Sequence, residues 1–268
     1  MTAGASQMSF FLLLAAVGGF LPTIFWLWFW LHEDRKKPEP TRLIMKTFIV
    51  GGFFIVAAFL LEKLVAPSGN LINQILDAYQ NNFSLWLIIT AGWPLVAWAL
   101  IEEFVKYAAA YVAALKNKNF DEPIDAMIYM ITAALGFAAV ENFLFLLNVL
   151  HTDNFALGSF LLTGNLRFLG ATLLHTVTSA TMGAFLSFSF YRSRRFKFLS
   201  GIIGLLTATA LHTLFNFFII VNEGSGVFRV LVVLWMFAMF IIFLFEIVKR
   251  LAYARTITKP INQQSYVQ

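Results

Sequence analysis

Five ionisable residues in otherwise apolar surroundings could carry out chemistry. Two glutamates are adjacent, a third follows about forty residues later, and two histidines lie further along. They are Glu102, Glu103, Glu141, His175 and His212. An ionised carboxylate costs about 2.5 to 3.5 kcal/mol to place at the centre of a membrane helix, so such groups face protein or a wet cavity. We therefore expect this set to serve a function.

The chemistry that such residues support is the activation of water. Two imidazoles and a carboxylate can hold a zinc ion at three positions and leave a fourth for water, with a second carboxylate as general base. The same groups could act without a metal, with a glutamate taking the proton from water while the histidines and Asn216 stabilise the oxyanion. Spacing alone does not decide between these two schemes.

The charged residues elsewhere in the apolar segments also have purely structural explanations. Lys106 is four residues after Glu102 and three after Glu103, so on a helix it can neutralise one carboxylate and leave the other available. Arg167 is expected to be an interfacial anchor or the partner of a carboxylate. Glu62 and Lys63 are expected to be an interfacial pair near the end of their segment. A single buried polar group is more often an interhelical hydrogen bond than a catalyst.

Composition places these residues in a membrane. The 268 residues are 60% hydrophobic and only 12% charged, and the chain has a net charge of +5. The basic residues form short clusters between apolar segments, which indicates membrane topology rather than a nucleic-acid surface, so no nucleic-acid partner is expected. Because the chain has no cysteine, any metal would need His and carboxylate ligands.

Seven apolar segments predict an all-α, multi-pass protein of the cell membrane, forming a single membrane domain over residues 1–268. Each segment is long enough to cross a hydrocarbon core of about 30 Å. The segments are residues 8–31, 45–66, 84–115, 123–150, 166–191, 198–221 and 227–249. Basic loops alternate with loops poor in Lys and Arg, which predicts an outside N-terminus and a cytoplasmic C-terminus. The loops at 67–83 and 151–165 are expected outside, and 250–268 is expected to be a disordered cytoplasmic tail.

The same assignment places the five residues at similar depths. Counted from the predicted cytoplasmic boundaries, they lie 13 to 18 residues into their segments, a spread of about 8 Å at 1.5 Å per residue. Small and polar residues occur on the same helix faces, where they allow close helix packing. We therefore expect one site built from four helices.

Four motifs in this order resemble the PrsW family of intramembrane proteases. They are Glu102-Glu103-Phe-Val-Lys106, then Phe137-Ala-Ala-Val-Glu141-Asn142, then Arg167 with His175, then His212-Thr-Leu-Phe-Asn216. The resemblance covers about residues 98–220, the expected catalytic core. It places the chain in a superfamily with CAAX prenyl endopeptidases and a polytopic scaffold subunit of gamma-secretase. One departure is Ala126, where relatives often have glycine.

The resemblance implies a protease that cuts membrane-anchored proteins, in PrsW itself an anti-sigma factor. Our leading hypothesis is a zinc-dependent endopeptidase that acts on single-span substrates within the bilayer. Its expected metal ligands are Glu141, His175 and His212, and its expected base is Glu102 or Glu103. One alternative is an inactive scaffold or chaperone of the same superfamily, and another is a proton or cation pathway, since acidic residues and histidines in membranes also form relays.

Overall fold

The computed structural model describes residues 2–33, 35, 37–65, 85–152, 157–222 and 225–257. The regular elements in these ranges are all helical. They are α1 (Thr2–Glu33), α2 (Thr41–Val65), α4 (Leu85–Ala110), η1 (Tyr111–Leu115), α5 (Pro123–Thr152), α6 (Leu157–Leu166), η2 (Arg167–Ala171), α7 (Thr172–Ser189), α8 (Arg194–Val221) and α9 (Ser225–Ile257). The predicted all-α fold is therefore confirmed.

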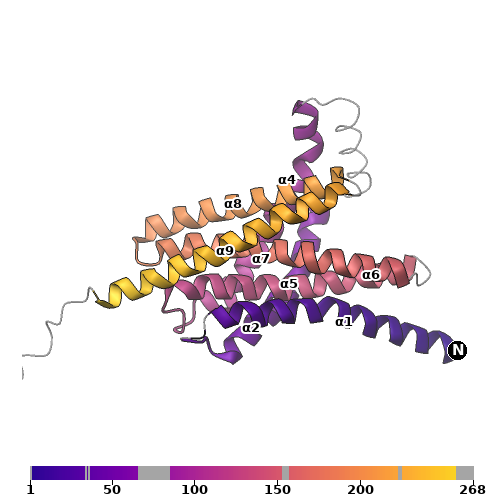
Figure 1. The fold of residues 1–268 in the computed structure, drawn as a ribbon, viewed down its shortest axis with the longest axis horizontal. Coiled ribbons are helices and arrows are strands. Elements are labelled where there is room, and N and C mark those ends of the chain that lie inside the picture. The colour runs from indigo at the N-terminus through magenta and orange to yellow at the C-terminus, as the bar shows by residue number, and fades with distance from the viewer. Residues whose placement is uncertain are drawn as a thin grey trace, which may run out of the picture.

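Helix α5 lies at the centre of the bundle. In Figure 1, α1, α5, α7, α8 and α9 run along the long axis, while the beginning of α4 projects away from them. Residues 123–139 of α5 are buried along their whole length, because α1, α2 and α7 all pack against this helix. A helix that is apolar on every side and surrounded in this way forms the core of a membrane bundle.

Glycines bring neighbouring backbones into direct contact with α5. A Cβ atom at Gly136 would collide with the Phe48 carbonyl of α2, and one at Gly183 of α7 would lie 2.7 Å from the Cα atom of Met127. Small residues permit such close approach between membrane helices, which then gain van der Waals contact. These contacts fix the two helices that adjoin the site against its central helix.

Six helices are long and apolar enough to cross a membrane, judged over the described residues. The predicted third segment corresponds to α4 and η1, and α4 is not among the six. It carries Glu102, Glu103 and Lys106. A membrane helix with three charges in its second half is tolerated in a bundle only when these charges face protein or water.

Several predicted boundaries differ from the structure. The loop expected at 151–165 contains α6, and the segment expected at 166–191 begins with the π turn η2 before α7. Helix α9 continues to Ile257, so residues 250–257 are helical rather than the start of an irregular tail. The loop expected at 67–83 and the remainder of the tail, 258–268, lie outside the described residues.

Three of the predicted cytoplasmic loops lie next to one another at one end of the bundle. They are the loops before α2, before α5 and after α7. Lys37, before α2, lies 3.0 Å from Asp121 and 2.9 Å from Glu122, which precede α5. These hydrogen bonds raise the pKa of the Lys37 ammonium group. The rings of Phe120 and Phe190 lie 5.1 Å apart and connect the loop before α5 with the one after α7. This arrangement agrees with one membrane face for all three loops; which face it is remains a prediction.

Candidate active site

Glu103 is the most enclosed carboxylate of the site. Its side chain is 1% exposed, and its Oε1 atom lies 2.6 Å from Lys106 Nζ and 2.7 Å from His212 Nδ1. Thr178 of α7 donates a third hydrogen bond to the same oxygen at 3.0 Å. Three elements, α4, α7 and α8, therefore meet at one carboxylate oxygen. The Oε1 atom is therefore well compensated, as a buried charge requires, whereas Glu103 Oε2 is buried without a hydrogen-bond partner.

A second network holds His175 from the opposite side. His175 Nε2 lies 2.9 Å from Glu141 Oε2, and the same oxygen lies 2.7 Å from Arg167 Nη2. Arg167 also donates to Asn142 Oδ1, and Asn142 donates to Thr172 Oγ1 at 2.9 Å. Arg167 begins the π turn η2, a kind of local widening that is frequent at functional sites. Arg167 is thus a carboxylate partner, one of the two roles expected for it.

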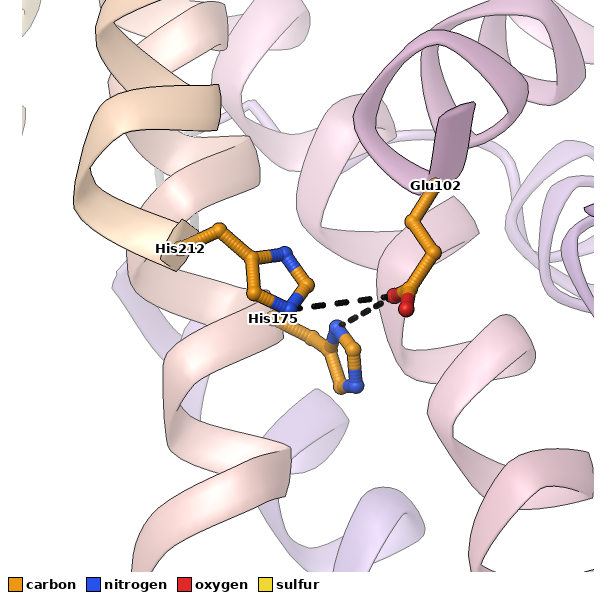
Figure 2. A group of neighbouring side chains, drawn as sticks. All are labelled: Glu102, His175 and His212. Carbon is orange, nitrogen blue, oxygen red and sulfur yellow. Dashed lines mark ion pairs between the residues drawn. The ribbon is translucent and has the colours of Figure 1, made fainter. Parts of the chain in front are cut away.

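Glu102 completes a group that could hold a metal ion. Its Oε2 atom lies 3.8 Å from His175 Nδ1 and 3.9 Å from His212 Nε2 (Figure 2). One ligand atom from each of these residues lies within 4.8 Å of the others. The Oε2 atom of Glu102 is buried and has no hydrogen-bond partner. Lys106 Nζ is 3.7 Å from this oxygen, too far for a hydrogen bond. An acceptor without a hydrogen bond between two imidazoles is suited to bind a cation or a proton donor such as water.

The hydrogen bonds assign the tautomer of each histidine. His212 donates from Nδ1 to Glu103, so its Nε2 lone pair is directed to the side of Glu102. His175 donates from Nε2 to Glu141, so its Nδ1 is an acceptor, and Lys106 Nζ lies 2.9 Å from that atom. A carboxylate behind each imidazole is the arrangement that orients histidine ligands around metals.

The donor set fits zinc. Two neutral imidazoles and one carboxylate form the usual three-ligand set of a catalytic zinc site, and the orphaned oxygen of Glu102 is one of the three ligand atoms. A cation bound there would replace Lys106 as the partner of His175 Nδ1. Lys106 would retain its contact with Glu103.

The structure brings the five expected residues together, in an arrangement that differs from the expected ligand set. Glu102 joins the two histidines in the group described above, whereas Glu141 lies at the other nitrogen of the His175 ring. Asn216 lies one turn after His212 on α8 and is half-buried. No contact among the described residues connects the Asn216 side chain with the carboxylates.

One charged residue near the site was missed by the sequence analysis. Glu62 of α2 was expected to form a pair with Lys63, but the described residues show no ion pair for it. Its carboxyl group is partly buried and lies in the field of the like charges of Glu102 and Glu141 and the opposite charge of Lys106. The available signal was its spacing of seven residues from Ile55 and four from Ala58, which places the three on one helix face.

Comparison with known proteins gives the family. The protein-family model described as PrsW family intramembrane metalloprotease matches residues 39–244 of this chain, which include every residue of the site. This chain belongs to the PrsW family. The relationship supports a protease function, and together with the six candidate spans it supports a multi-pass membrane location.

Individual relatives agree with the family assignment. The chain is 28% identical to Protease PrsW of Clostridioides difficile over 214 residues, covering 77% of this chain and 81% of the relative. It is 26% identical to Protease PrsW of Geobacillus kaustophilus over 129 residues, covering 48% of this chain and 50% of that relative. No solved structure shows a significant match.

Proposed function

We propose that this PrsW-family protein is an endopeptidase that hydrolyses a peptide bond of a single-span membrane protein at Glu102, His175 and His212. The observation that carries the proposal is the convergence of three ligand atoms within 4.8 Å at a buried position between α4, α7 and α8. Hydrolysis adds the oxygen of water to the carbonyl carbon, breaks the C–N bond and transfers a proton to the leaving amine. The site therefore has to position water and carry that proton.

Each residue of the site has a role in this scheme. Glu102, His175 and His212 would hold zinc, which when bound lowers the pKa of a water ligand to about 7. Glu103 accepts a hydrogen bond from the N–H group of His212, and Glu141 accepts one from that of His175. The other nitrogen of each ring keeps its lone pair for the zinc ion. Lys106 compensates the charge of Glu103, and Arg167 compensates that of Glu141.

The residues also permit a scheme without a metal. In that case Glu102, whose Oε2 atom lacks a hydrogen-bond partner, takes the proton from water, and the two imidazoles contact the reacting groups. Both schemes place Glu102 at the reacting atoms and Glu103 behind His212. They differ in whether purified, active protein contains stoichiometric metal.

Glutamine substitutions at the two adjacent glutamates test this division of roles. We expect Glu102→Gln to lower the rate of cleavage about 10²- to 10⁴-fold, with little change in unfolding temperature, because the amide cannot take a proton in the scheme without a metal and lacks the carboxylate charge that holds zinc in the other. Glu103→Gln should lower both activity and stability, because Lys106 and His212 lose their shared charged partner. The assay is cleavage of a single-span substrate in liposomes, with zinc measured on the same preparations.

Glu33→Gln serves as the control, since Glu33 pairs with Lys249 away from the site. Full activity in both site variants would end this mechanism. Folded wild-type protein that cleaves no membrane substrate would favour the inactive scaffold.

A further inference from the structure

Glu62 lies on the face of α2 that packs beneath the site. Ile55 and Ala58, on the same face, are buried and form a cluster with Val105 of α4 and Phe137 of α5. The Phe137 ring in turn contacts the His175 ring, with 5.7 Å between their centroids. The next turn of this α2 face after Ala58 is occupied by Glu62.

The directions of the helices place Glu62 at the level of the site carboxylates. Lys37, before α2, pairs with Asp121, before α5, so these two helices begin at the same end of the bundle. Lys46 of α2 donates to the Ala113 carbonyl after α4, so α4 runs in the opposite sense. One turn beyond the apolar cluster in this direction lie Glu141 on α5 and Glu102 on α4. The electrostatic interaction of Glu62 with these two carboxylates agrees with this placement.

Glu62 differs from the other three carboxylates in having no resident cation. Glu102 and Glu103 share Lys106, and Glu141 is paired with Arg167. Over the described residues no lysine, arginine or histidine lies within ion-pair distance of Glu62, and the adjacent Lys63 is exposed. Glu62 itself is partly exposed, so its carboxylate is accessible to another molecule.

An unpaired carboxyl group within a membrane segment is either protonated or paired with a cation, because apolar surroundings make an isolated charge costly and strengthen an ion pair. A metal ion is not a suitable partner, since the group of converging ligand atoms among the described residues does not include Glu62. A cation that pairs with Glu62 has to come from another molecule, and a substrate with a basic side chain would bring one to this position.

We propose that Glu62 is a substrate-recognition residue that binds a lysine or arginine side chain close to the scissile bond. This proposal rests on the proposed function, because it takes the Glu102 group to be where the substrate is cut. Glu62 selects the substrate and has no part in moving the proton of water. It lies on α2, which packs against both α4 and α5, the helices that carry Glu102 and Glu141.

The test compares single-span peptides that differ at one position. Lysine, glutamine or glutamate is placed in turn at each position along one half of the span, and the peptides are added to the protein in nanodiscs. Binding is measured as Kd from the initial fluorescence change, before product accumulates, and cleavage as kcat/KM. We expect wild-type protein to bind the lysine peptide about tenfold or more tightly than the glutamate peptide at one or two positions, as for a charged hydrogen bond.

Two variants of Glu62 and one control give the decisive comparison. Glu62→Gln should reduce this preference to about twofold, and Glu62→Lys should reverse it, because opposite charges attract and like charges repel across a site. Lys63→Gln changes a neighbouring exposed charge and should leave the preference intact. If the Glu62 variants do not fold, acetylation of the peptide lysine should abolish the preference of wild-type protein.

The outcomes separate this inference from the proposed function. Cleavage without a charge preference, or a preference that survives Glu62→Gln or lysine acetylation, overturns the role of Glu62 and leaves the protease intact. A charge preference that depends on Glu62, in protein that cleaves none of the peptides, supports the binding role and counts against hydrolysis. Equal loss of activity toward all peptides in Glu62→Gln, with an unchanged ratio, also overturns the inference.

Discussion

Lys106 shares one positive charge among three partners. Its Nζ atom is buried and lies 2.6 Å from Glu103, 2.9 Å from His175 and 3.7 Å from Glu102. The ring of Phe137 covers it at 5.3 Å. Removing one member of a buried charge network leaves the others uncompensated, which is strongly destabilising.

We therefore expect Lys106→Met to lower the free energy of unfolding by about 3 to 5 kcal/mol. Unfolding in detergent, followed by intrinsic fluorescence, measures this change. Lys116→Met is the matched control, because Lys116 is exposed and its ammonium group lies over the Tyr111 ring. Equal stability of the two variants would show that Lys106 does not hold the site together.

Arg167 acts on the site through Glu141. We expect Arg167→Gln to weaken zinc binding about 10- to 100-fold, the usual effect of losing a residue that orients a metal-bound histidine. Arg167→Lys should recover part of this affinity, since it restores the charge but not the contact that the guanidinium makes with Asn142.

Zinc titration of stripped protein gives the readout for Arg167, independent of cleavage. Arg229→Gln, an exposed arginine of α9, is the control. Unchanged zinc affinity in Arg167→Gln would leave Arg167 as a structural residue only. No zinc binding by any form, wild type included, would favour the scheme without a metal.

The meeting of these residues could be predicted from sequence, whereas their pairing could not. Depth along a helix follows from residue counting, and it correctly predicted that Glu102, Glu103, Glu141, His175 and His212 come together. Which carboxylate meets which ring nitrogen depends on helix rotation and side-chain torsions, which residue counting does not contain. The predicted ligand set therefore contained Glu141, whereas in the structure the carboxylate grouped with the two histidines is Glu102.

At the scale of helices, apolar length identified the elements and missed their irregularities. Six of the seven predicted segments correspond to helices that are long and apolar enough to span a membrane. The exception is the third segment, which contains the charged helix α4. The π turn at Arg167 was not predicted, because hydropathy does not distinguish one helical hydrogen-bond register from another. The turn begins at the residue that pairs with Glu141, a tertiary contact that hydropathy does not contain.

The contact of α2 with α5 predicts a sharp difference between two glycines. Gly136→Ala should destabilise the protein by about 1 to 3 kcal/mol, because the added methyl group meets the backbone of Phe48 and the helices must separate. Gly158→Ala should be neutral or slightly stabilising, because the space around a Cβ atom at Gly158 is open and alanine favours the helix. Thermal unfolding in detergent distinguishes them. Equal unfolding temperatures would mean that the close contact contributes nothing.

For the whole molecule, the orientation in the membrane is the main remaining prediction. Single cysteines at positions 118 and 195, introduced into this cysteine-free chain, should resist a membrane-impermeant reagent in intact cells and react after lysis. The reason is the excess of basic residues in these loops, which favours the cytoplasm. A cysteine at position 2 should react in intact cells. Labelling at position 195 in intact cells would contradict the predicted orientation and indicate the opposite one.

The glycine contact between α2 and α5 limits how the protein can open. Sliding α2 along α5 would drive side chains into backbone, so these two helices must move as one rigid body. The distance between Glu62 on α2 and Glu141 on α5 should therefore stay the same when a substrate enters. If the protein admits a polypeptide, as proposed, we expect the displacement to occur away from the α2–α5 contact, at α4 or α8.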